Sequence, residues 1–190
     1  MNGRLFTLAA IVLIVALYNY VERRHPTTET ATVNTANLPD YTMTRVEITT
    51  TGDSGAIHDK IEADELIHYP ASDDEWQGRV ELSQPRMEIF SQGGDTHWRL
   101  EATRGELFGR SRALLRDGVT ITAVDPAAEG DAIITTSALE YRFHSQLLES
   151  EGAIKLRSPQ MNLSAGGLQL DMRRDQITLH HGVHGKYHEP

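Results

Sequence analysis

Apolar residues recur at every second position along most of the chain after residue 40. The alternation is clear in Trp98-Arg-Leu100-Glu-Ala102, in Val119-Thr-Ile121-Thr-Ala123 and in Leu168-Gln-Leu170-Asp-Met172. Successive side chains of a strand point to opposite faces, so this period indicates strands with one buried and one solvated face. No stretch after residue 24 shows the i, i+3, i+4, i+7 spacing of an amphipathic helix. We therefore expect an all-β domain over residues 41–190.

The strands also form a repeat. Four segments share an apolar residue, a small residue two positions later and a leucine further on, and each is followed by a glycine. A repeat of about 30–40 residues made of short strands is typical of stacked β units that cannot cover their own apolar faces. The connections are too short for helical crossovers, which predicts antiparallel neighbours in two facing sheets, as in a jelly roll or rolled sandwich. The small residue would fit a corner where a strand bends between the sheets. The segments start at Ile61, Leu100, Ile134 and Leu163, and the glycines are Gly78, Gly118, Gly152 and Gly182.

The N-terminus differs from the rest because residues 5–21 carry no charge. As a helix this stretch would be roughly 25 Å long, close to the ~30 Å hydrocarbon core of a bilayer. A cleaved signal peptide is the alternative, but no small-x-small site follows Leu17. The sequence therefore predicts one uncleaved transmembrane helix in residues 1–24, whose orientation the balanced flanking charges do not decide. The threonine-rich residues 25–40 predict a linker.

Charge and cysteine content exclude some classes of function. The chain has a formal net charge of −9 and no cysteine. An acidic domain is a poor match for the phosphates of nucleic acids, so we expect no nucleic-acid partner. The lack of cysteine excludes disulfides, thiolate nucleophiles and cysteine-based metal sites.

No residue pattern indicates an active site. The tail places His180, His184 and His188 at a spacing that could share one strand face, but glycines interrupt this register and no carboxylate ligand is well spaced. The acidic residues 73–75 lie in a polar stretch typical of a solvated turn. No nucleophile elbow, phosphate loop or dinucleotide fingerprint is present. We expect no catalytic residue, no metal and no cofactor.

Several short segments together resemble one family. The N-terminal apolar stretch and threonine-rich linker are followed by segments whose order, spacing and total length are similar to those of the LptC family of lipopolysaccharide export proteins of the Gram-negative inner membrane. The resemblance runs along nearly the whole chain. The segments are Pro39-Asp40-Tyr41, Trp98–Ala102, Leu115–Ile121, Ile134–Thr136, Ser158-Pro159 and Gly166–Leu168.

The resemblance implies a twisted antiparallel β-jelly roll with an open groove, preceded by one transmembrane helix. It implies a chain that is single-pass in the inner membrane, with the domain of residues 41–190 in the periplasm. That domain would accept lipopolysaccharide from an inner-membrane ABC transporter of the LptB, LptF, LptG type. It would pass the lipid to an LptA-like bridge protein through a C-terminal edge strand, and it would catalyse nothing.

The alternation and the resemblance together give two sets of candidate site residues. The residues expected to face the lipid are Trp98, Leu100, Ile121, Tyr141, Ile154, Leu163 and Leu170. The residues expected to bind the partner are Ile177, Leu179, Val183 and Tyr187, with 177–183 forming a single edge strand.

Two other classes of function remain open from the sequence. A membrane-tethered enzyme acting on polysaccharides would need a paired carboxylate site in a cleft. A structural envelope tether would have a filled core, and the same alternation predicts a filled core as readily as a lipid groove.

Overall fold

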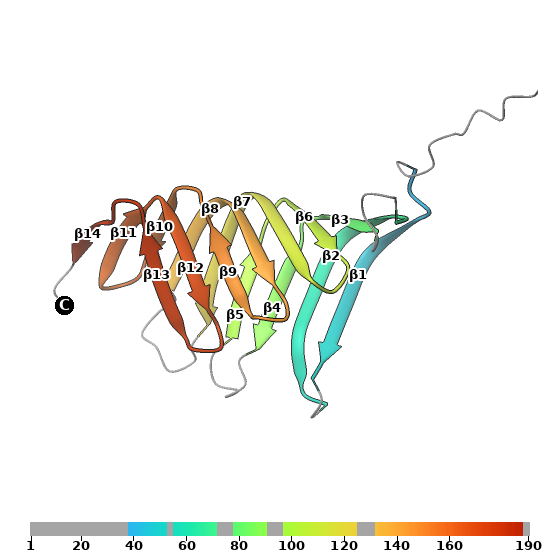
Figure 1. Cartoon of the computed structure of the whole chain (residues 1–190), viewed down its shortest axis with the longest axis horizontal. Helices are drawn as coiled ribbons and strands as arrows, with labels where there is room; N and C mark the ends of the chain where they lie inside the picture. Colours follow the sequence, from blue (N-terminus) through green and yellow to red (C-terminus); the bar gives the residue numbers. More distant parts are fainter. Residues whose placement is uncertain (1–37, 53–54, 72–77, 91–96, 125–131, 188–190) are drawn as a thin grey trace, which may run out of the picture. The chain divides into compact units, whose positions relative to one another are not determined.

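The computed structural model describes residues 38–52, 55–71, 78–90, 97–124 and 132–187. Within these ranges the regular structure is entirely antiparallel strand, as the alternation predicted (Figure 1). No helix among the described residues is long and apolar enough to cross a membrane. The expected transmembrane segment of residues 1–24 and almost all of the expected linker lie outside the described ranges.

The described residues form fourteen strands. They are β1 (Tyr41–Thr51), β2 (Ile57–Tyr69), β3 (Arg79–Ser83), β4 (Arg86–Phe90), β5 (His97–Glu101), β6 (Arg104–Phe108), β7 (Arg112–Val124), β8 (Ala132–Arg142), β9 (Leu147–Ser150), β10 (Ile154–Arg157), β11 (Met161–Ala165), β12 (Gly167–Asp171), β13 (Gln176–His180) and β14 (His184–Tyr187).

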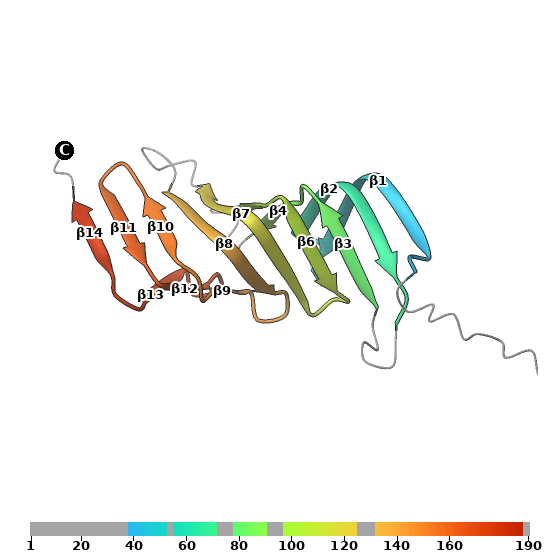
Figure 2. The ribbon, with the colours of Figure 1, turned by 90° about the horizontal axis from the view of Figure 1, so that it is seen from above.

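The pairing registers divide these strands between two facing sheets. The long strands β1, β2, β7 and β8 belong to both, with one half of each strand in each sheet. The first sheet contains β3, β6, β9, β12 and β13, with residues 41–44, 65–69, 112–116 and 138–142 of the shared strands. The second sheet contains β4, β5, β10, β11 and β14, with the remaining halves. Figure 2 shows β10, β11 and β14 of the second sheet side by side.

The chain crosses from one sheet to the other along a single side, which we call the spine. Asp117 and Gly118 adopt positive φ angles of 65° and 72° there, and the β7–β8 register shifts at the same point. Successive crossings are hydrogen-bonded to each other: Thr103 N–H donates to the Asp117 carbonyl at 3.1 Å, and Gly166 N–H donates to the His181 carbonyl at 3.1 Å. The opposite side carries the hairpin turns within each sheet, and we call it the turn side.

The spine explains the sequence repeat. The small residues of the four repeated segments lie at crossings, which confirms the predicted corners. Gly166 shows why size matters, since a Cβ there would lie 2.8 Å from Cβ of His181. Gly118, Gly152 and Gly182 also lie at crossings, whereas Gly78 lies in the turn before β3.

The apolar side chains of both sheets meet in one interior. Leu100, Leu115, Tyr141 and Leu170 have no exposed surface, and the alternating polar residues of the same strands face solvent. Burial of this surface is the main favourable contribution to folding.

Candidate functional site

The seven residues predicted to face lipid all belong to this interior. Trp98, Leu100, Ile121, Ile154 and Leu163 come from the second sheet, and Tyr141 and Leu170 come from the first. Six of them are buried, and Leu163 is half-buried near the C-terminal end. The period of two was therefore sufficient to identify the inward face, although burial alone does not distinguish a lipid site from a core.

The interior is filled by the protein's own side chains in this structure. Leu100, Ile121, Tyr141 and Leu170 are fully enclosed, each with 0% exposure. Packed interiors do not accept an extra chain without moving side chains or backbone. A long apolar ligand could therefore enter only if the sheets separated or if it displaced residues from an end of the interior.

A buried polar cluster links the two sheets across the turn side. The Tyr141 hydroxyl of the first sheet donates to Asp59 Oδ1 of the second sheet at 3.1 Å, although 82 residues separate them. His58 Nδ1 lies 2.6 Å from Asp59 Oδ2, and Gln146 Nε2 lies 2.6 Å from His58 Nε2. Asp59 is 2% exposed and Gln146 5% exposed. We call His58, Asp59, Tyr141 and Gln146 the cross-sheet clasp.

The environment of the clasp keeps Tyr141 protonated. Burial, and then the neighbouring Asp59 carboxyl, raise the pKa of Tyr141 well above its ordinary value of 10.0. The phenol therefore remains a hydrogen-bond donor at alkaline pH values at which an ordinary tyrosine ionises. Sequence reasoning placed Tyr141 correctly but missed Asp59, which shares the inward face of β2 with Ile61 and Ala63. An acidic residue on an apolar strand face was the available signal.

The C-terminal region differs from the expected single edge strand. Residues 177–183 do not form one strand, because β13 ends at His180 and the chain then crosses to the other sheet. His181 and Gly182 adopt positive φ angles of 61° and 74° in the break between β13 and β14. Ile177 and Leu179 therefore lie on β13 of the first sheet, Tyr187 lies on β14 of the second, and Val183 lies between the strands.

Both C-terminal strands have one unpaired edge among the described residues. β13 pairs only with β12, and β14 pairs only with β11. The Met172 N–H donates to the Gln146 carbonyl, so the main-chain groups of every second residue of β12 point toward β9 and the others point toward β13. In this register the main-chain N–H and C=O groups of Ile177 and Leu179 point away from β12. On the other sheet, the Ser158 N–H donates to the Met161 carbonyl. By the same alternation, the main-chain N–H and C=O groups of Gly185 and Tyr187 point away from β11.

Inward-pointing apolar side chains remain exposed where the sheets end. Ile177, opposite the buried Leu170, is 41% exposed, and Tyr187, opposite the core-packed Met161, is 72% exposed. Val183, between the two strands, is 50% exposed. At the other end Tyr41 and Met43 of β1 are 44% and 50% exposed. The interior is thus closed in the middle and uncovered at both ends.

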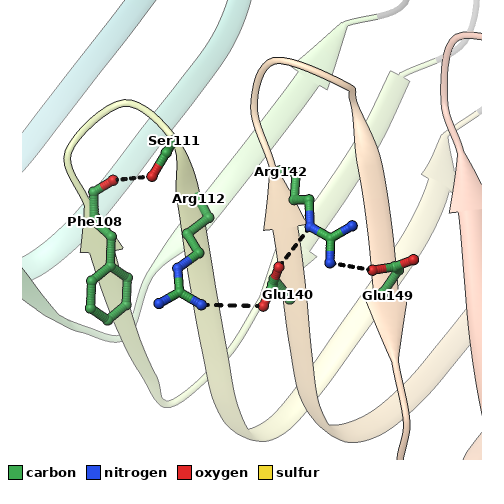
Figure 3. Close-up of polar contacts among 6 residues, drawn as sticks. All are labelled: Phe108, Ser111, Arg112, Glu140, Arg142 and Glu149. Atoms are coloured by element: carbon green, nitrogen blue, oxygen red, sulfur yellow. Dashed lines mark hydrogen bonds and ion pairs between the residues drawn. The ribbon is translucent and has the colours of Figure 1, made fainter.

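The outward faces are polar and largely neutralised by local pairs. On the first sheet, Arg142 contacts Glu140 at 2.8 Å and Glu149 at 2.7 Å, and Arg112 contacts Glu140 at 3.5 Å (Figure 3). At the adjacent turn, Ser111 Oγ donates to the Phe108 carbonyl at 2.7 Å. These contacts join neighbouring strands by charge pairing, and exposed pairs of this kind add little stability each.

The described residues contain no group of three or more histidine, aspartate or glutamate side chains placed to hold a metal ion. His180 lies on β13 and His184 on β14, so the structure separates two of the three histidines considered from the sequence. His188 and the acidic residues 73–75 lie outside the described ranges.

Two antiparallel sheets that are joined at a spine and enclose an apolar interior define a β-jelly roll. A family model described as "Lipopolysaccharide-assembly, LptC-related" matches residues 7–188. The chain belongs to this LptC family. Its role therefore lies in lipopolysaccharide transport, within a family of transport proteins.

A solved structure has a similar fold. It is the crystal structure of LptH, the LptA-homologous periplasmic component of the lipopolysaccharide transport device from Pseudomonas aeruginosa. The match has a TM-score of 0.52 at 10% sequence identity and covers 70% of this chain and 95% of that chain. Comparison with curated proteins found no match.

Proposed function

We propose that this chain accepts lipopolysaccharide from an inner-membrane ABC transporter of the LptB, LptF, LptG type and passes it to an LptA-like bridge protein. The observation that carries this proposal is an apolar interior that is closed in the middle and uncovered at both ends. An acylated lipid could be sheltered there from water and leave in the direction of a partner's interior.

The anchor would hold this body at the membrane. Residues 5–21 would form a single transmembrane helix of the inner membrane, with residues 25–40 as linker and residues 41–190 in the periplasm. This arrangement would place the β1 end of the interior nearest to the membrane along the chain.

Acyl chains would lie between the sheets, against Trp98, Leu100, Ile121, Tyr141, Ile154, Leu163 and Leu170. Because these side chains now fill the interior, loading would require the sheets to part on the turn side, with the spine as the hinge. The clasp joins the two sheets on that side, so its hydrogen bond between Tyr141 and Asp59 would have to break. The transporter's ATPase would supply the energy for loading.

Release would use the C-terminal edges. The unpaired groups of β13 and β14 could extend both sheets into a partner by strand addition, which gives affinity through main-chain hydrogen bonds. Ile177, Leu179, Val183 and Tyr187 lie at this end, and the exposed ones would be covered by the partner.

A structural envelope tether is a second candidate, and the filled interior is the observation that favours it. The two functions differ in whether lipid moves. The test is to reconstitute the full chain with the transporter and an LptA-like partner in proteoliposomes and to follow lipopolysaccharide by ATP-dependent crosslinking to the partner. Transfer that requires this chain supports the proposal, whereas transfer at the same rate without it favours the tether.

A further inference from the structure

Three adjacent strands at the C-terminal end of the second sheet carry positive charge without any acid. β10, β11 and β14 contain no aspartate or glutamate, although the chain as a whole has a net charge of −9. They contain Lys155, Arg157 and Lys186, and also His184. A local excess of one sign on an oppositely charged protein attracts ligands of the opposite charge.

These side chains share the outward face. Arg157 pairs in register with Asn162, and Asn162 pairs with Lys186, so that the three lie in one row across the sheet. Lys155, Ser164 and His184 form the next row toward the spine. Both rows line a shallow groove of about 690 Å³. Lys155, Ser164 and His184 also line a neighbouring groove of about 520 Å³, which adds the hydroxyl-bearing Thr135 and Ser137.

Within the described part of the chain, the cations of this groove form no ion pair, unlike most other cations on the outer faces. Lys60 lies 2.7 Å from Glu62, and Arg99 lies 3.3 Å from Glu88, both on the second sheet. Lys155, Arg157 and Lys186 have no carboxylate within ion-pair distance among the described residues. Placing several like charges together without an acid costs free energy, which a bound anion would offset.

The position of the groove relates it to the interior. Arg157 is the last residue of β10 before the turn at residues 158–160, on the turn side where the sheets are not joined. The inward faces of the same strands carry Leu156 and Leu163, which contribute to the apolar interior. A ligand with apolar chains between the sheets and an anionic head outside the turn side would place that head beside Arg157 and Lys186.

We propose that Lys155, Arg157 and Lys186 bind phosphate groups on the saccharide head of the acylated glycolipid carried by this chain. This site deepens the proposed function and rests on it. Arginine offers a planar fork that matches phosphate oxygens, and lysine adds a mobile point charge. Ser164 and Thr135 offer neutral hydrogen-bonding groups for sugar hydroxyls. The site would hold the head while the acyl chains remain between the sheets.

The test uses the full chain in a non-ionic detergent and two labelled probes, lipopolysaccharide and the same lipid after enzymatic removal of its lipid A phosphates. The variant is Lys155→Gln/Arg157→Gln/Lys186→Gln. A matched control, Arg110→Gln/Arg116→Gln/Arg173→Gln, removes three exposed cations elsewhere. A second variant, Arg157→Lys/Lys186→Arg, keeps the charge. Dissociation constants are measured for both probes, and circular dichroism checks the fold.

We expect the wild type, the control and the charge-conserving variant to bind the phosphorylated lipid about fivefold or more tightly than the dephosphorylated lipid, as charge-assisted contacts would give. The glutamine triple variant should bind both probes equally, at the wild-type affinity for the dephosphorylated lipid. If the triple variant keeps the preference, the phosphate site is overturned while the proposed function stands. If the wild type binds neither probe, the proposed function fails and the site fails with it.

Discussion

Asp59 is an acidic residue on a strand face that is otherwise apolar, and only 2% of its surface is exposed to solvent. Its two oxygens contact the Tyr141 hydroxyl at 3.1 Å and His58 Nδ1 at 2.6 Å. A buried carboxyl keeps such a position only when its hydrogen bonds are satisfied. The clasp is therefore the polar element of the interior that is most sensitive to substitution.

Tyr141→Phe should destabilise the domain by about 1–3 kcal/mol, because it leaves a buried acceptor on Asp59 without its donor while keeping the ring. Urea denaturation measures the change in the free energy of unfolding. Tyr69→Phe is the matched control, since that hydroxyl makes a weaker contact of 3.3 Å with the half-exposed Glu81. Equal losses in the two variants would contradict a special role for the clasp.

The same tyrosine predicts a loss of stability in alkali. Its pKa is raised in the folded state, so the folded protein holds the phenolic proton more tightly than the unfolded chain does. The contribution is fully present below the ordinary tyrosine pKa of about 10 and is lost as the pH rises above it. Denaturation midpoints above pH 10 should therefore fall more steeply in Tyr69→Phe than in Tyr141→Phe. Parallel curves for the two variants would show that Tyr141 ionises as freely as an exposed tyrosine.

At the scale of single residues, the sequence predicted the inward face well because a strand has a strict period of two. Leu100, Ile121 and Leu170 follow from that period alone. The clasp could not be predicted, since the pairing of Tyr141 with Asp59 depends on how two distant strands face each other across the interior. An acid among the buried residues of the inward face of β2 is a signal for an interior polar contact, but it does not identify the partner.

β13 is the element whose free edge can be tested most sharply. Leu179→Pro should weaken binding of an LptA-like partner about tenfold or more, because the ring removes a main-chain donor that points away from β12 and obstructs pairing. Leu179→Ala keeps the main-chain donor and should weaken partner binding less than Leu179→Pro does. Affinity is measured with the purified full chain, and circular dichroism should show the sheet retained.

Thr178→Pro is the complementary variant, because alternation directs its N–H toward β12. It should lower the stability of the domain more than Leu179→Pro does. If Leu179→Pro binds the partner as well as the wild type, β13 is not the docking edge and pairing through β14 remains to be tested in the same way with Tyr187→Pro.

At the scale of elements, the sequence indicated strands, antiparallel pairing and corners at small residues, and the structure confirms all three. The continuous C-terminal strand over residues 177–183 was wrong. Ile177, Leu179 and Val183 fit a period of two, but His181 and Gly182 turn the backbone into the left-handed region. The alternation of apolar residues predicts which face of a strand a residue occupies. It does not predict where the chain passes from one sheet to the other.

For the whole chain, the anchor gives a direct prediction. Intact-mass measurement of protein extracted from membranes should show that residues 1–24 are retained, because no small-x-small cleavage site follows Leu17. A product that begins near residue 20 would contradict this. Protease added to spheroplasts should digest the β domain if it lies in the periplasm, and a protected domain would place it on the other side.

In the proposed function, lipid acyl chains occupy the interior between the two sheets. Strand β5 tests it within four consecutive residues, since Trp98 and Leu100 are buried whereas Arg99 and Glu101 face outward. A photo-crosslinking amino acid is placed at each position in turn in the full chain, in cells that export lipopolysaccharide. Capture of lipopolysaccharide at positions 98 and 100 but not at 99 and 101 is the predicted result. Capture at all four positions, or only at 99 and 101, would contradict an interior lipid site.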